Sequence, residues 1–127
     1  MGVVTDISTG GTSLRATVSV DAGRADVALT GEIDRLTGPA LTGLLEATMC
    51  AGVRHLDLQM TRVTFVDLGG LRALARAHHV AAQRRITLTL RRPTPQTRWL
   101  LQVADATALL LDGAGTPDDS KDVSPVK

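Results

Sequence analysis

The stretch from Arg62 to Leu74 constrains the fold more than any other part of the sequence. It joins an apolar strand to a helical pattern through a turn at Asp67. Two glycines, Gly69 and Gly70, follow within the first expected turn of the helix. Asp67 can cap this helix, because its carboxylate accepts hydrogen bonds from free N–H groups of the first turn. Each glycine costs about 1 kcal/mol relative to alanine inside a helix, so the pair indicates that something approaches the helix backbone closely.

Apolar periodicities on both sides of this turn give the order of the other elements. Apolar and polar residues alternate, as in half-buried strands, over residues 14–20, 25–29, 56–60 and 86–90. Helical spacing predicts three helices, which run from Thr37-Gly38-Pro39 to about Gly52, from Asp67 to about Gln83, and onward from Thr94-Pro95. The order β-β-α-β-α-β-α predicts an α/β fold, a single domain in which helices pack on a mixed four- to five-stranded sheet.

The two ends of the chain differ in composition from this central region. Residues 1–12 are rich in Gly, Thr and Ser without a sustained period, so we expect a flexible N-terminal arm with at most an edge strand at Val3-Val4. The domain then occupies residues 13–111, with a short final strand or helix at Leu109–Leu111. Residues 112–127 contain four Asp and two Lys and few apolar groups, which predicts a disordered acidic tail.

The turn at Asp67 resembles the Asp-Ser-Ser-Gly-Leu signature of STAS domains, a family named for sulphate transporters and anti-sigma factor antagonists. The resemblance places Asp67, Gly70 and Leu71 on the Asp, Gly and Leu of the motif. Leu68 and Gly69 fall on its two serines.

Two further segments are similar to the same family. Gly31-Glu32-Ile33-Asp34 resembles the Gly-Glu-Leu-Asp segment that closes its second strand, and Thr94-Pro95 resembles its Ser-Pro helix start. With the element order, these segments extend the resemblance over roughly residues 13–111. The resemblance implies a STAS-like domain of the anti-sigma factor antagonist type, a regulator that binds other proteins and is not an enzyme.

In the anti-sigma antagonists, the second serine of the signature is phosphorylated by the partner, an anti-sigma factor that is an ATP-binding serine kinase. The same position here is Gly69, which has no hydroxyl. The resemblance therefore implies an antagonist that binds such a kinase and releases the sigma factor that the kinase sequesters. It also implies that phosphorylation at this position does not inactivate the antagonist. Thr64 is a secondary candidate for phosphorylation, although we favour its interpretation as an ordinary strand residue.

The residues expected to contact the partner surround the predicted helix start and are Asp67, Leu68, Gly69, Gly70 and Arg72, with Glu32 and Asp34 on the neighbouring loop. A helix N-terminus exposes unpaired N–H groups and partial positive charge, so it can also hold an anion. The simpler alternative is that the glycines only let the helix pack closely on a strand. Three other functions stay open: a scaffold subunit in stress signalling, a partner of a lipid-transport ATPase, and a sensor of a small anionic ligand.

Other classes of function find little support in the sequence. A net charge of +1 and only two aromatic residues, Phe65 and Trp99, disfavour nucleic-acid binding. No apolar run is long enough to cross a membrane and no signal peptide opens the chain, so we expect a cytoplasmic protein. We find no catalytic or cofactor motif, and the three histidines are poorly placed to share a metal ion. Trp99 and the lone Cys50 are predicted to be buried.

Overall fold

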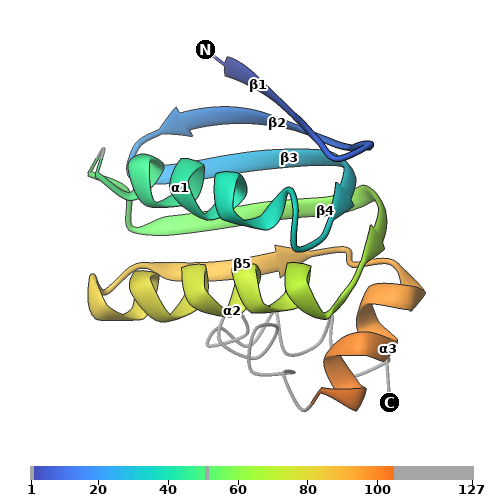
Figure 1. The fold of residues 1–127 in the computed structure, drawn as a ribbon. Coiled ribbons are helices and arrows are strands. Elements are labelled where there is room, and N and C mark those ends of the chain that lie inside the picture. Colours follow the sequence, from blue (N-terminus) through green and yellow to red (C-terminus); the bar gives the residue numbers. More distant parts are fainter. Residues whose placement is uncertain (1, 51, 105–127) are drawn as a thin grey trace.

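The computed structural model describes residues 2–50 and 52–104. Their strands form one sheet in the spatial order β1-β2-β3-β4-β5 (Figure 1). The strands are β1 (Gly2–Thr9), β2 (Thr12–Asp21), β3 (Arg24–Ile33), β4 (His55–Val66) and β5 (Thr87–Arg91). β1, β2 and β3 pair antiparallel, whereas β4 pairs in parallel with both β3 and β5. The predicted mixed sheet with packed helices is therefore confirmed, with five strands.

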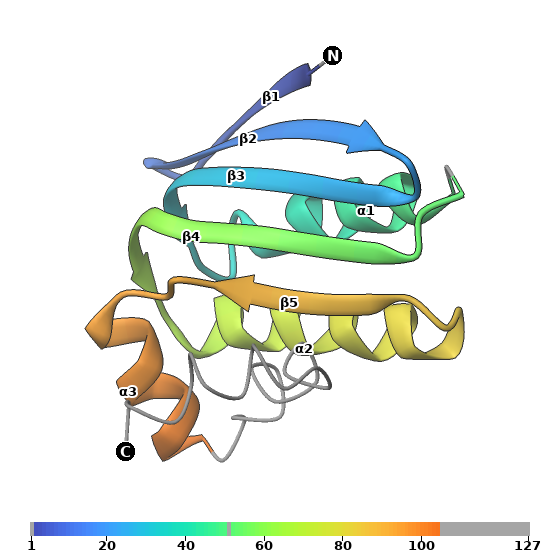
Figure 2. The same ribbon diagram turned by 180° about the vertical axis from the view of Figure 1, so that it is seen from behind.

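Two helices cover one face of the sheet. α1 (Gly38–Met49) connects β3 to β4, and α2 (Leu68–Gln83) connects β4 to β5. Both lie in front of the sheet in Figure 1, and Figure 2 shows the opposite face with no labelled helix over it. α3 (Pro95–Val103) follows β5 and lies beside the end of the sheet where β4 leads into α2 (Figure 1). None of the described helices is long and apolar enough to cross a lipid bilayer.

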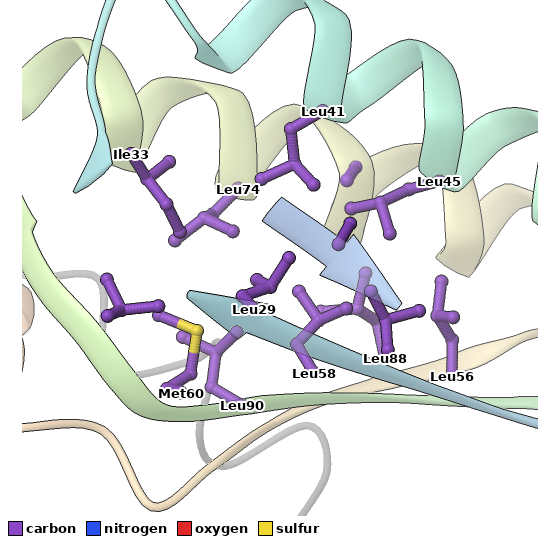
Figure 3. Packing of buried hydrophobic residues seen from close by; sticks show 14 of the residues in the cluster. Leu29, Ile33, Leu41, Leu45, Leu56, Leu58, Met60, Leu74, Leu88 and Leu90 are labelled. Carbon is purple, nitrogen blue, oxygen red and sulfur yellow. The ribbon is translucent and has the colours of Figure 1, made fainter. Parts of the chain in front are cut away.

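Leucine side chains from α1, α2 and the central strands form one core (Figure 3); fully buried examples are Leu29, Leu41, Leu45, Leu58, Leu74 and Leu88. Burying one such side chain contributes about 1.5–3 kcal/mol. The strand residues that alternate with these buried leucines point to the face without helices and are mostly polar. This arrangement explains the alternation of apolar and polar residues in the sequence. Asp57 lies on that face but is buried, because Nη1 of Arg24 (2.7 Å) and Nε of Arg91 (3.7 Å) contact its carboxylate.

The N-terminal region differs from the prediction. In place of the flexible arm expected over residues 1–12, the structure has the strand β1, which pairs with β2 along its whole length and joins it through Gly10 and Gly11. The sequence of β1 shows no clear alternation, because most of its side chains are exposed at the sheet edge and polar residues there carry no burial penalty. The folded sheet therefore includes residues that lie outside the domain predicted from the sequence.

Helix α3 confirms one prediction and corrects another. It starts where expected, and the hydroxyl of Thr94 accepts a hydrogen bond from the Thr97 backbone N–H (3.4 Å). Trp99, predicted to be in the core, is 60% exposed, because the helix turns Leu100 and Leu101 inward instead. Cys50, also predicted to be buried, is exposed at the end of α1.

The predicted element at Leu109–Leu111 and the predicted acidic tail over 112–127 lie outside the residues that the structure describes.

Candidate functional site

The junction between β4 and α2 forms as the sequence predicted. Strand β4 ends at Val66, and Asp67 has an extended backbone (φ −105°, ψ −174°) at the N-cap position of α2. Its Oδ1 accepts a hydrogen bond from the Gly70 N–H at 2.8 Å, and its own N–H donates to the Ile33 carbonyl at 3.3 Å. Asp67 therefore caps α2 and also joins its start to the end of β3.

The two glycines of this helix start lie against the loop between β3 and α1. A Cβ added to Gly70 would overlap the Ile33 carbonyl group, with the carbonyl carbon at 2.5 Å and the Asp34 nitrogen at 3.1 Å. A Cβ added to Gly69 would lie 2.5 Å from Cβ and 2.8 Å from the backbone nitrogen of Arg35. The group that approaches this backbone closely is thus a loop of the same chain. Internal packing alone accounts for the glycine pair.

Asp34 organises that loop and is not an exposed acidic contact as the sequence suggested. It is 8% exposed, and its Oδ1 accepts hydrogen bonds from the backbone N–H groups of Leu36 and Thr37, each at 2.9 Å. The hydrogen bond from the Thr37 N–H, followed by that from Leu36, holds the pKa of this carboxyl below its ordinary value, although burial acts in the opposite direction. The Thr37 hydroxyl completes the loop by donating to the Glu32 carbonyl at 2.8 Å. Asp34 therefore fixes the loop that covers both glycines.

The exposed residues around this helix start are partly apolar. We use the name α2 tip for the exposed residues in and near the segments that meet at this helix start, which are Arg35, Leu36, Phe65, Leu68 and Arg72. Leu68, the first residue of α2, is 56% exposed.

Only two of the α2 tip residues, Leu68 and Arg72, are among the partner contacts predicted from the sequence. Glu32 and Gly69 are half-buried and Gly70 is buried.

Phe65 and Leu36 were missed by the sequence analysis. Near the end of β4, Val63 and Val66 are both buried although they are three residues apart, and the pairing between β3 and β4 shifts its register beside Gly31. This irregularity leaves Phe65 exposed on a strand where simple alternation would have placed it inward with Val63. In the sequence, the three-residue spacing of Val63 and Val66 was the one signal of this irregularity.

Helix α3 braces the same junction through Gln96, another residue that the sequence analysis did not identify. The Gln96 side chain accepts a hydrogen bond from the Val66 N–H (3.2 Å) and donates one to the Val66 carbonyl (2.9 Å). An amide side chain satisfies both polar groups of a strand residue in this way. The last residue of β4 is therefore held between β3 and α3.

The structure also bears on Thr64 and on the metal site considered from the sequence. Thr64 is exposed on β4, and its hydroxyl donates to the Gly31 carbonyl at 3.1 Å, as expected of a strand residue at a sheet irregularity. Within the described ranges, no group of three or more His, Cys, Asp or Glu residues is placed to hold a metal ion.

The sequence matches the family model described as "Mlab, STAS domain" over residues 16–112. Among curated protein sequences, none matches this chain significantly.

Solved structures with a similar fold include an anti-sigma factor antagonist from Mycobacterium paratuberculosis, with 24% identity and a TM-score of 0.63 over 75% of this chain and 80% of that one. The anti-sigma factor antagonist SpoIIAA in its unphosphorylated form gives 14% identity and a TM-score of 0.65 over 74% and 84% of the two chains. The phosphorylated form of SpoIIAA, a Bacillus cell fate determinant, gives 16% and 0.60 over 74% and 86%. At these identities the likeness concerns the fold. The family match, in contrast, takes in the segment from β2 to α3 and hence most of the sequence, and the chain belongs to the STAS domain family.

Proposed function

We propose that this protein is an anti-sigma factor antagonist that binds an anti-sigma factor through the α2 tip. Its membership of the STAS family and its fold, shared with two anti-sigma factor antagonists, support this function. By the same resemblance, the partner is a serine kinase of the ATP-binding type, and binding releases the sigma factor that the kinase sequesters. The protein then acts by binding and not by catalysis, in the cytoplasm together with its partner.

The exposure of Leu68 is the observation that carries this proposal. The family signature has a serine at this position, whereas this chain presents a leucine that is 56% exposed at the first position of a helix. Phe65, three residues earlier, is also exposed. An apolar group beside the N–H groups of a helix start suits contact with a protein surface better than contact with water, because burial of its apolar area favours association.

The proposed antagonist is not phosphorylated at position 69, for two separate reasons. Glycine offers no hydroxyl, and the backbone at this position lies beneath Arg35. A side chain at position 69 would lie 2.8 Å from the Arg35 backbone nitrogen, so a serine there would also require the β3–α1 loop to move. The missing hydroxyl and the close loop together favour an antagonist that its kinase cannot inactivate here.

The helix start is a poor site for a small anion. The carboxylate of Asp67 already accepts the hydrogen bond from the Gly70 N–H, and the Arg35 backbone lies close to Gly69. An incoming anion would therefore meet a negative charge where helix N-termini normally offer free donors. This geometry disfavours the ligand-sensor alternative.

A stress-signalling scaffold or a partner of a transport ATPase would use the same fold. Identification of the bound protein distinguishes these two functions from that of an anti-sigma factor antagonist.

The docking surface can be tested with substitutions of two apolar residues that are both more than half exposed. Leu68→Ser changes the α2 tip, and Val103→Ser changes the end of α3, where Val103 is 63% exposed. Binding to the kinase-type anti-sigma factor encoded in the same genome would be measured by isothermal titration calorimetry. We expect Leu68→Ser to weaken binding at least tenfold, about 1.4 kcal/mol, and Val103→Ser to leave it unchanged. Equal affinities of wild type and Leu68→Ser would refute docking at the α2 tip.

The role of position 69 needs a control for loop displacement. Gly69→Asp adds a carboxylate that crudely imitates a phosphorylated relative, while Gly69→Ala introduces the same overlap with Arg35 without charge. We expect Gly69→Asp to be captured by the anti-sigma factor more weakly than Gly69→Ala.

A separate experiment tests phosphorylation: wild-type protein incubated with the kinase and ATP should gain no phosphate by intact-mass spectrometry. A phosphate on Thr64 or another hydroxyl of this region would contradict the claim that the antagonist is not switchable.

A further inference from the structure

The outer edge of β1 is unpaired within the described part of the chain. β1 is the first strand in the sheet order and runs for eight residues, from Gly2 to Thr9. It contains no proline or lysine and only one charged residue, Asp6, whose carboxylate is bound to Nε of Arg15 on the neighbouring strand at 2.8 Å. A long, nearly uncharged edge strand is a template for pairing with another chain, and proteins usually protect such edges.

The opposite edge of the same sheet carries such protection. β5 has only five residues and ends at Arg91, and it is followed directly by Arg92 and Pro93. A short strand with positive charge and a proline at its end resists the addition of a further strand. One edge of this sheet is thus protected while the other is open.

The hairpin between β1 and β2 shows which backbone groups lie on the open edge. Gly10 and Gly11 form a two-residue turn with φ values of 60° and 87°, as in a type I′ turn. In such a hairpin the residues flanking the turn, Thr9 and Thr12, are a hydrogen-bonded pair, and the pairs then alternate along the ladder. The backbone N–H and C=O groups of Val4, Asp6 and Ser8 therefore point away from β2.

We infer that a second copy of this protein pairs antiparallel with β1 along this edge, centred on Thr5 opposite Thr5. In this register Val4 lies opposite Asp6 of the second copy, and Val3, which is 62% exposed, lies opposite its Ile7. Val3 would thereby be covered by an apolar neighbour on the same face. The two sheets become one continuous sheet with the helices of both copies on the same side.

Charge and strand length together select this register over its two neighbours. The outward groups alternate, so the nearest other registers that preserve hydrogen bonding are centred on Asp6 and on Val4. The register centred on Asp6 places two carboxylates directly opposite each other, which is destabilising. The register centred on Thr5 separates the carboxylates and pairs the residues from Gly2 to Ser8, whereas the register centred on Val4 pairs only those from Gly2 to Asp6. The edge is therefore complementary to itself, and for this reason we assign it to a second copy and not to an unrelated peptide.

Sedimentation equilibrium of the full chain tests for the dimer. We expect the wild-type mass to rise from 13.4 kDa towards twice that value as the concentration increases towards about 1 mM. Val4→Pro removes an N–H of the open edge without removing a bond to β2, so it should remain monomeric with unchanged circular dichroism. Val4→Thr keeps the N–H and should still dimerise. A wild type that stays monomeric, or a dimer that Val4→Pro does not disrupt, would overturn the inference.

Cross-linking tests the register. With Cys50→Ser as the background, Thr5→Cys places two thiols at a non-hydrogen-bonded pair, where opposing Cα atoms lie about 4.5 Å apart, within the range of a disulfide. Ser8→Cys is the matched control, because its two copies would lie about 20 Å apart in this register. We expect mild oxidation to produce a covalent dimer from Thr5→Cys only. Failure of Thr5→Cys to cross-link, or equal cross-linking of Ser8→Cys, would exclude the proposed pairing.

Discussion

Replacing Gly70 with alanine tests the central packing claim, that the start of α2 lies against β3 with no room for a side chain. In an open helix position this substitution stabilises the protein, because alanine is favoured over glycine by about 1 kcal/mol. Gly43 in α1 is such a position: it is exposed, and an added Cβ would have no neighbour within 4 Å. Gly43→Ala is therefore the matched control, with the same chemical change in a helix of the same domain.

At Gly70 the added methyl group meets backbone, which cannot rotate away. Overlap with the Ile33 carbonyl group and with the Asp34 nitrogen must be relieved by moving α2 away from β3. This movement strains two hydrogen bonds of the junction, Gly70 N–H to Asp67 and Asp67 N–H to Ile33. Overpacking costs about 1–3 kcal/mol, and each weakened hydrogen bond about 1 kcal/mol. After subtraction of the helix-propensity gain of about 1 kcal/mol, we expect a net destabilisation of about 2–4 kcal/mol.

Urea unfolding followed by far-ultraviolet circular dichroism measures both variants, since Trp99 is exposed and is a poor fluorescence probe of the core. We expect Gly43→Ala to raise the free energy of unfolding by about 0.5–1 kcal/mol. Gly70→Ala should lower the urea midpoint with an unchanged slope. If Gly70→Ala is as stable as Gly43→Ala, the helix start does not lie against Ile33 and the account of the glycine pair is wrong.

Two further predictions concern the loop and α3. Asp34→Asn should lower the free energy of unfolding by about 1 kcal/mol at pH 7. Because the folded-state pKa of Asp34 is lowered, the stabilisation by its carboxylate is present above the ordinary carboxyl pKa of about 3.9 and is lost as pH falls through the folded value. The difference in free energy of unfolding between wild type and variant, measured with urea, should therefore close in acid. A gap that widens in acid would contradict the assigned hydrogen bonds. Trp99→Ala should change the free energy of unfolding by less than about 1 kcal/mol, whereas Leu101→Ala, whose side chain is fully buried, should cost about 2–5 kcal/mol; equal losses would place Trp99 in the core after all.

The elements that were predictable from the sequence are those whose signals are local. The cap at Asp67, the end of α2 at Gln83 and the start of α3 after Thr94 depend on residues a few positions apart, and all three are confirmed. The sequence indicated at most an edge strand at Val3-Val4, and the full length of β1 escaped prediction because an edge strand needs no apolar alternation. Trp99 was misplaced because α3 contacts the sheet on one side only, and the sequence does not say which side.

The tip of α2 shows a different limit of sequence analysis. Two glycines after a capping Asp indicated a close approach to the helix backbone but not its source, which is the loop held by Asp34 and lies far from the turn in sequence. The position of this loop also bears on the absence of a hydroxyl group at Gly69. Since the backbone nitrogen and Cα of Arg35 lie within 2.8 Å of a Cβ at position 69, no substitution at position 35 alone would make room for a serine. Under the proposed function, the absent hydroxyl and the close packing of the loop both oppose phosphorylation at position 69, and a serine there would require a different loop conformation as well as a different residue.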